Sequence, residues 1–154
     1  MTAARGSNSV DTSGIENPQR LEFEVPADTR SVGEARHAVT TFLVAREVPT
    51  AIVDDIELAT SELVTNAVLH PVPSEHDVKV YVEVDTHVTL TVANHGPMHA
   101  IPPVACWSPA PPNALSGRGL GIVRRITDEA GVRQDGSWTV VSCARRLPGG
   151  RAAE

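Results

Sequence analysis

Apolar and polar residues alternate strictly over positions 78–84 and again over 88–92, with valine or leucine at every second place. Such alternation is typical of a strand with one buried face, so the two runs predict an antiparallel hairpin. Leu21 to Val25 alternates apolar with acidic residues and predicts another half-buried strand nearer the N-terminus.

Two segments between these strands carry apolar residues three and four positions apart, which predicts two helices. Ser31 is a candidate N-cap of the first helix, with Glu34 at the capping-box position. The second helix begins at Thr50 or Asp54 and runs to about His70, where prolines follow. The side chains expected to face inward are Ala35, Val39, Phe42 and Leu43 in the first helix and Ile52, Ile56, Ala59, Leu63 and Ala67 in the second.

The C-terminal part of the chain predicts one more helix and one more hairpin. The helix starts at a glycine-rich stretch, at Gly117, and runs to about Ala130. Asp135-Gly136 is typical of a two-residue hairpin turn and lies between strands predicted at 132–134 and 138–144. Before this helix, residues 97–116 have no period and hold 6 of the 12 prolines. A loop of this length is typical of a lid or a binding loop, and the alternative is an insertion without function.

The predicted order is strand, helix, helix, strand, strand, lid, helix, strand, strand. We therefore expect an α/β fold, a two-layer α/β sandwich in which helices cover one face of a mixed sheet. Residues 20–147 form the predicted domain. The leader at 1–19 is rich in Ser, Asn, Thr and Gly and is expected to be disordered, and 148–154 is expected to be a flexible tail.

Charge and composition exclude several functions. The 154 residues carry a net charge of −6, with −9 over residues 1–112 and +3 over 113–154. A net-acidic chain with five aromatic residues is a poor candidate for binding nucleic acid through phosphates or base stacking. The excess of arginine instead predicts a local anion site in the C-terminal third. The only lysine, Lys79, is far from any glycine loop, which excludes a P-loop.

Two cysteines give neither a disulfide framework nor a metal site. The N-terminus has no apolar signal segment, and no run approaches the ~18 apolar residues that a membrane span needs. We expect a cytoplasmic protein without a membrane association.

Glu62 and Asn66 are the first pair of residues with candidate chemistry. Four positions apart on a helix, they lie within about 40° of each other, at the margin of the apolar face. A carboxylate can take a proton from a hydroxyl, and an amide oxygen is a suitable Mg²⁺ ligand. The alternative is a solvated helix edge that carries a side-chain hydrogen bond.

Glycines mark the other candidate sites. The third predicted helix opens with Gly117, Arg118, Gly119, Leu120 and Gly121. The free backbone N–H groups of a helix N-terminus and the guanidinium of Arg118 favour binding of a phosphate there. The alternative is a loop hinge that needs positive φ. Asn94-His-Gly96, at the end of a predicted strand, indicates by itself only a turn.

Taken together, these motifs resemble the Bergerat-type ATPase superfamily, and within it the small bacterial anti-sigma factor serine kinases. Residues 61–70 are similar to that family's N box, 92–97 stand where its first glycine box lies, and 116–123 are a close match to its second glycine box. The resemblance extends from about Leu21 to Leu147.

The resemblance implies an ATP- and Mg²⁺-dependent serine protein kinase with Glu62 as general base and Asn66 as Mg²⁺ ligand. It implies that the stretch from Gly117 to Gly121 shapes the triphosphate site under the lid. It also implies that Asn94 and Gly96 belong to the adenine site, with Thr139 lining the pocket. The implied partners are an anti-anti-sigma protein, whose serine is phosphorylated, and a sigma factor, which is sequestered, often by a homodimer.

Asn94 departs from the family pattern, which has an aspartate that accepts a hydrogen bond from the adenine amino group. An amide oxygen still accepts this bond, but the bond is weaker than one to a carboxylate. A glycine of the first box is also replaced near Met98, and Pro71 stands where glycine is frequent. The alternative function is therefore a non-catalytic Bergerat-type module that binds a partner with weak or no ATP binding.

Four further side chains have open interpretations. Trp107 is expected to anchor the lid, and Trp138 is expected to lie in the core rather than stack on a ligand. Arg124, with its neighbour Arg125, is either a solvated helix face or a contact for a partner or phosphate.

Overall fold

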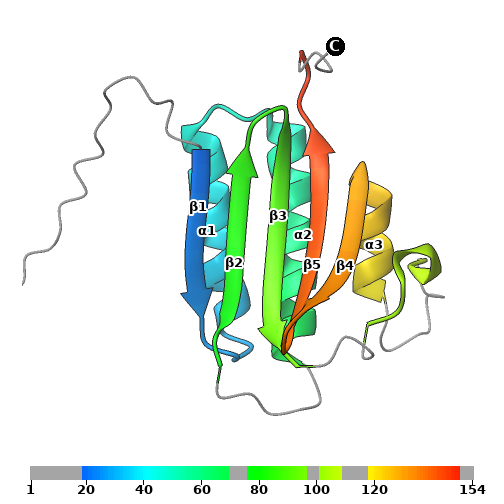
Figure 1. The fold of residues 1–154 in the computed structure, drawn as a ribbon. Helices are drawn as coiled ribbons and strands as arrows, with labels where there is room; N and C mark the ends of the chain where they lie inside the picture. Colours follow the sequence, from blue (N-terminus) through cyan, green and yellow to red (C-terminus); the bar gives the residue numbers. More distant parts are fainter. Residues whose placement is uncertain (1–18, 70–75, 97–100, 109–117, 150–154) are drawn as a thin grey trace, which may run out of the picture.

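A five-stranded sheet with helices on one face makes up the fold (Figure 1). The computed structural model describes residues 19–69, 76–96, 101–108 and 118–149, with the side chain of Arg118 excepted. The elements along the chain are β1 (Gln19–Val25), α1 (Ser31–Ala45), α2 (Thr50–Val68), β2 (Val78–Val84), β3 (His87–His95), the 3-10 turn η2 (Val104–Cys106), α3 (Arg118–Ile126), β4 (Glu129–Asp135) and β5 (Trp138–Arg146).

The element order and the two-layer α/β arrangement confirm the prediction, but the sheet is antiparallel at every pairing rather than mixed. The strand order is β1-β2-β3-β5-β4. Two helices separate β1 from β2, so the chain returns to the same end and β2 runs opposite to β1. One helix separates β3 from β4, so these strands run in the same direction, but β5 lies between them.

Side chains on the helix-facing side of the sheet build the core. Leu21, Val82, Leu90 and Cys143 form one row across four strands, with each residue opposite the next in the register. The inward positions predicted for the first two helices are all buried. In Figure 1, α1 lies behind β1, α2 behind β3 and β5, and α3 behind β4. Among the described residues no helix is both long enough and apolar enough to span a membrane.

Two local predictions are wrong by one residue. Ser31 is not the N-cap of α1 but its first residue. Arg30 takes the N-cap position without a side-chain cap, and the Ser31 amide donates to the Asp28 carbonyl at 2.9 Å. In the last hairpin the loop is Gly136 and the next residue, because Asp135 is still paired within the ladder. Gly136 has φ +60°, a conformation that favours glycine.

The predicted boundaries of several elements also shift. The second helix begins at Thr50, one of its two predicted starts, and ends at Val68. The third ends at Ile126 rather than near Ala130, because the Asp128 amide already bonds to the Ala144 carbonyl of β5 at 2.8 Å. Gln19, placed in the leader by the sequence, begins β1. The rest of the leader, most of the predicted lid and residues 150–154 lie outside the described residues.

One end of the sheet collects the elements that carry the candidate motifs. β3 and α2 end there, and α3 and β5 begin there, at the bottom of Figure 1. Two hydrogen bonds join the strands at this end: the Gly96 amide donates to the Ser137 carbonyl at 2.8 Å, and the Thr139 hydroxyl donates to the Gly96 carbonyl at 2.7 Å. Residues distant in the sequence are thereby fixed side by side.

Candidate functional site

Glu62 of α2 packs directly against Gly119 in the first turn of α3. A Cβ atom added at position 119 would collide with Oε2 of Glu62 and would lie 3.3 Å from both its Cβ and its Cδ. Gly119 is buried and Glu62 is partly exposed. The glycine therefore leaves room for the Glu62 side chain beside the first turn of α3. A carboxylate beside the N-terminus of a helix also has a favourable interaction with the helix dipole.

Asn66 lies one turn beyond Glu62 on the same helix and is exposed. Among the described residues no group of three or more His, Cys, Asp or Glu side chains is placed to hold a metal ion. Mg²⁺ usually keeps several waters and takes only one or two protein ligands when it is bound with phosphates. The Asn66 amide oxygen is a ligand of the right chemistry for such a site.

Asn94 and Thr139 face each other across β3 and β5, on the side of the sheet that carries the helices. Asn94 continues the buried series of β3, whose preceding members contribute to the core, and it is 6% exposed. Its Nδ2 atom is shielded and has no hydrogen-bond partner in the described part of the chain. Thr139 is 1% exposed, and its hydroxyl is engaged by the Gly96 carbonyl. The structure thus brings together the three residues that the resemblance assigns to the adenine site.

The glycine-rich stretch is only partly described. Gly117 and the side chain of Arg118 lie outside the described residues. Leu120 is buried in the core cluster with Val123, and Gly121 is buried. Leu120 therefore attaches α3 to the core, while Gly119, which has no side chain, places its backbone against the Glu62 side chain.

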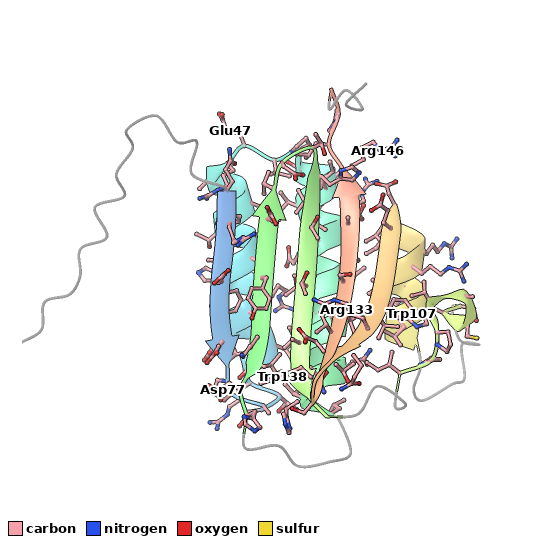
Figure 2. The ribbon with its side chains drawn as sticks, viewed as in Figure 1. Glu47, Asp77, Trp107, Arg133, Trp138 and Arg146 are labelled. Carbon is pink, nitrogen blue, oxygen red and sulfur yellow. The ribbon has the colours of Figure 1, made fainter. Side chains whose placement is uncertain are left out.

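Trp107 anchors the segment 101–108, as predicted. It is 2% exposed, belongs to the core cluster and donates from Nε1 to the Pro102 carbonyl at 2.8 Å. Figure 2 shows it beside α3. Arg124 of α3 donates from one guanidinium nitrogen to the carbonyls of Ala105 and Trp107, both at 3.1 Å. Arg124 thus holds the segment 101–108, a role that neither of its two predicted alternatives included, because the acceptors are backbone atoms and leave no sequence signal.

Trp138 does not lie in the core, which corrects the prediction. Side chains alternate along a strand, so with Thr139 and Val141 facing the helices, Trp138 faces the open side of the sheet. There Lys79 Nζ lies 4.3 Å from its ring centroid, and the ring of His95 lies 5.5 Å away.

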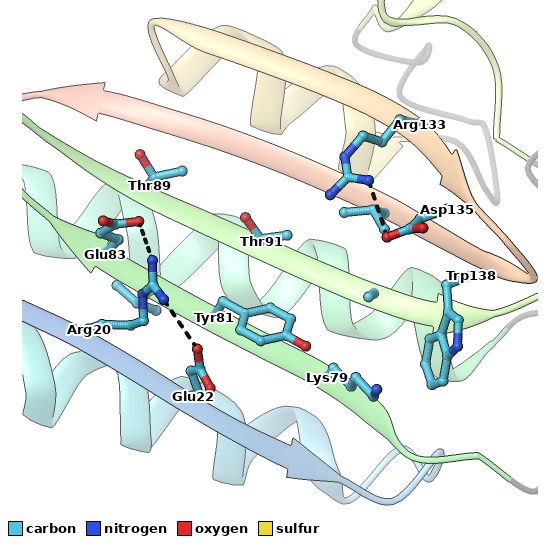
Figure 3. Close-up of a pocket in the computed structure, with 13 residues that line it drawn as sticks. Arg20, Glu22, Lys79, Tyr81, Glu83, Thr89, Thr91, Arg133, Asp135 and Trp138 are labelled. Atoms are coloured by element: carbon cyan, nitrogen blue, oxygen red, sulfur yellow. Dashed lines mark hydrogen bonds and ion pairs between the residues drawn. The ribbon is translucent and has the colours of Figure 1, made fainter. Parts of the chain in front are cut away.

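The open face of the sheet has a hollow of about 400 Å³ (Figure 3). Ion pairs line it: Arg20 lies 3.3 Å from Glu83 and 3.6 Å from Glu22, and Arg133 lies 3.5 Å from Asp135. Among the described residues, none of the site residues predicted from the sequence lines this hollow. Glu62, Asn94 and Thr139 instead lie on the opposite, helix-covered side of the sheet.

Comparison with known proteins adds an independent observation. Residues 25–144 match the family described as the histidine kinase-like ATPase domain. The chain belongs to this family. The matched region covers most of the chain, from the end of β1 almost to the end of β5.

Within the histidine kinase-like ATPase family, the chain is 30% identical over 142 residues to the anti-sigma F factor of Pasteuria penetrans. The match covers 86% of this chain and 93% of that protein. This likeness identifies the chain with the anti-sigma factor kinase-like group of the family, as the motifs at 61–70 and 116–123 predicted.

Two solved structures share the fold. One contains the RsbU and RsbW domains of Rv1364c from Mycobacterium tuberculosis, with a TM-score of 0.64 and 20% identity. The match covers 83% of this chain and 32% of the other, so the present chain spans about a third of that protein. The other is the SiaB-SiaC complex from Pseudomonas aeruginosa, with a TM-score of 0.57, 18% identity and coverages of 80% and 88%.

Proposed function

We propose that this chain binds ATP with Mg²⁺ and transfers the terminal phosphoryl group to a serine of an anti-anti-sigma protein. The observation that carries the proposal is the contact between Glu62 and Gly119, because it places a carboxylate beside the first turn of α3. Phosphoryl transfer depends chiefly on positioning and on charge stabilisation. A helix N-terminus supplies N–H donors for phosphate oxygens, and the carboxylate supplies a base.

Each candidate residue has one task in this proposal. Glu62 accepts the proton of the attacking serine hydroxyl, and Asn66 is the protein ligand of Mg²⁺, which neutralises charge on the phosphates. The backbone from Gly117 to Gly121, with Arg118, holds the triphosphate. Asn94 and Thr139 hold the base, with Thr139 kept in place by its bond to Gly96.

The partners follow from the same group of proteins. The relative in Pasteuria penetrans is named an anti-sigma F factor, and we infer that this chain likewise sequesters a sigma factor, in the cytoplasm and as a homodimer, without touching nucleic acid itself. The acidic part of the chain, with a net charge of −9 over residues 1–112, suits a basic protein partner. Binding that does not weaken between low and physiological salt would contradict this role for charge.

Transfer is tested with labelled ATP and an anti-anti-sigma protein from the same organism. Loss of a general base lowers the rate about 100-fold or more, so we expect this loss for Glu62→Ala. Glu57→Ala is the matched control, because Glu57 lies on the same helix but pairs with Arg36 at 3.7 Å. Equal transfer by Glu62→Ala and the wild type would contradict the assignment.

A second function is favoured by Asn94, where the family has an aspartate. The chain is then a binding module that recognises its partner and transfers nothing. Calorimetric titration with Mg-ATP separates the two functions. No binding at millimolar nucleotide, combined with tight binding of a sigma factor, would favour the module.

A further inference from the structure

The side chain of Asn94 has an unsatisfied hydrogen-bonding group in a fixed place. The residue is 6% exposed, and its Nδ2 atom is shielded from water and has no acceptor among the residues that the structure describes. A buried donor without an acceptor is unfavourable, and such groups in native proteins usually have a partner or a functional reason. An acceptor supplied by a ligand would remove this cost.

The described neighbours of Asn94 do not engage its amide nitrogen. Its cross-strand neighbour Thr139 already donates its hydroxyl proton to the Gly96 carbonyl at 2.7 Å. The Gly96 amide is bonded to the Ser137 carbonyl at 2.8 Å. These bonds hold the ends of the two strands together, so the backbone that carries Asn94 is fixed before any ligand binds.

A primary amide presents one acceptor and one donor edge side by side. Adenine presents the complementary pair, an amino donor at position 6 and the N1 acceptor. A 6-oxopurine presents the reverse pair, the O6 acceptor and the N1–H donor. Rotation of the amide by half a turn about its Cβ–Cγ bond exchanges Oδ1 and Nδ2, so one side chain matches either base.

We propose that Asn94 recognises the base and makes the site accept purine nucleotides with either an amino or an oxo group at position 6. This inference rests on the proposed nucleotide binding and specifies its ligand class. An aspartate in the same place has only acceptors when ionised, so it favours adenine and is repelled by O6. Replacing the carboxylate by an amide therefore removes the basis of discrimination at this position.

Direct binding of ATP and inosine triphosphate to the full chain, each with Mg²⁺, tests the proposal. The two nucleotides differ only at position 6 and N1, so the ratio of their dissociation constants isolates this contact. For the wild type we expect a ratio within about 10-fold. For Asn94→Asp we expect ATP to be preferred by about 100-fold or more, because inosine then places an acceptor against a carboxylate.

Asn94→Leu is the second variant, since it has nearly the same volume and neither donor nor acceptor. It removes the unsatisfied group, so it should fold stably, bind both nucleotides more weakly than the wild type and give a ratio of dissociation constants of about one. Wild-type preference for ATP above 100-fold, or unchanged affinities in Asn94→Leu, would overturn the proposal and leave nucleotide binding intact. Failure of the wild type to bind either nucleotide would overturn the proposed function, and this inference with it.

Discussion

Glu62 and Gly119 meet so closely that any side chain at position 119 would overlap the carboxylate. Gly119→Ala should therefore displace the Glu62 carboxylate and lower the free energy of unfolding by at most about 1 kcal/mol, because the clashing Oε2 atom is the end of a flexible side chain and alanine favours a helix. Transfer of phosphate should fall as well, because the proposed base moves. Chemical denaturation and the labelled-ATP assay measure the two effects.

Gly33→Ala is the control for this substitution. Gly33 lies inside α1, and a Cβ atom added there would have nothing within 4 Å, so alanine should raise stability by about 0.5–1 kcal/mol through helix propensity. Combining Gly119→Ala with Glu62→Ala should recover much of the lost stability. Equal effects of alanine at the two glycines would show that the contact is unimportant.

Arg124 should hold the segment 101–108 against α3. Arg124→Ala removes the donor to two backbone carbonyls, so we expect the amides of Cys106 and Trp107 to exchange roughly 10-fold faster with deuterium. Arg125→Ala is the matched control, since the neighbouring arginine is exposed and has no hydrogen bond or ion pair to another described residue. Exchange that is the same in both variants would assign Arg124 to the solvated face.

Asp55 should link α2 to β5 through Arg145. Arg145 Nε lies 3.1 Å from Asp55 Oδ2 and its Nη1 lies 3.7 Å from Asp128 Oδ2, with about a third of each side chain exposed. The Nε contact is an ion pair without a well-directed hydrogen bond. We expect Asp55→Ala to lower the free energy of unfolding by about 1 kcal/mol, against about 0–0.5 for Glu22→Ala in an exposed pair. Urea denaturation at two salt concentrations measures both losses. Equal losses of stability in Asp55→Ala and Glu22→Ala would contradict the larger role of the Asp55–Arg145 pair.

Cys143 should make the fold sensitive to alkali. Burial raises the pKa of its thiol from 9.0 to about 12. The folded chain keeps the thiol protonated while the unfolded chain releases the proton, so this stability is complete below pH 9 and is lost as the pH rises towards 12. The slope approaches about 1.4 kcal/mol per pH unit.

Cys143→Val isolates this contribution, because valine fills the same place without an ionisable group. The difference in unfolding free energy between the wild type and Cys143→Val, measured at several pH values from about 8 to about 11, should change with the expected slope. A difference that stays constant over this range would exclude the buried thiol as its source.

Patterns of burial within one element were predictable from the sequence. Alternation in β2 and β3 and helical spacing in α1 and α2 follow directly from which face is buried, so these elements and their core residues are confirmed. Trp138 was misplaced because the prediction did not apply the alternation within its own strand, in which the buried Thr139 and Val141 face the helices and Trp138 therefore faces the open side.

Contacts between elements carry a weaker signal. The sequence places Glu62 on a helix margin and Gly119 at a helix start, but only the packing of α2 on α3 brings them together. Arg124 could not be assigned, because its acceptors are carbonyl groups of residues whose own sequence has no period. The orientation of Asn94 follows from its place in β3, while its unsatisfied nitrogen is visible only in three dimensions.

Adjacent residues at the end of β3 and the start of β5 serve opposite sides of the sheet. Asn94 and Thr139 face the helices, while His95 and Trp138 face the hollow side, and each pair is joined in the same ladder. Only the thickness of the sheet therefore separates the helix-covered side from the open side at this place. A nucleotide bound on one side and a protein partner bound on the other would contact neighbouring members of the same four residues. The fluorescence of the Trp138 indole would then respond to both ligands.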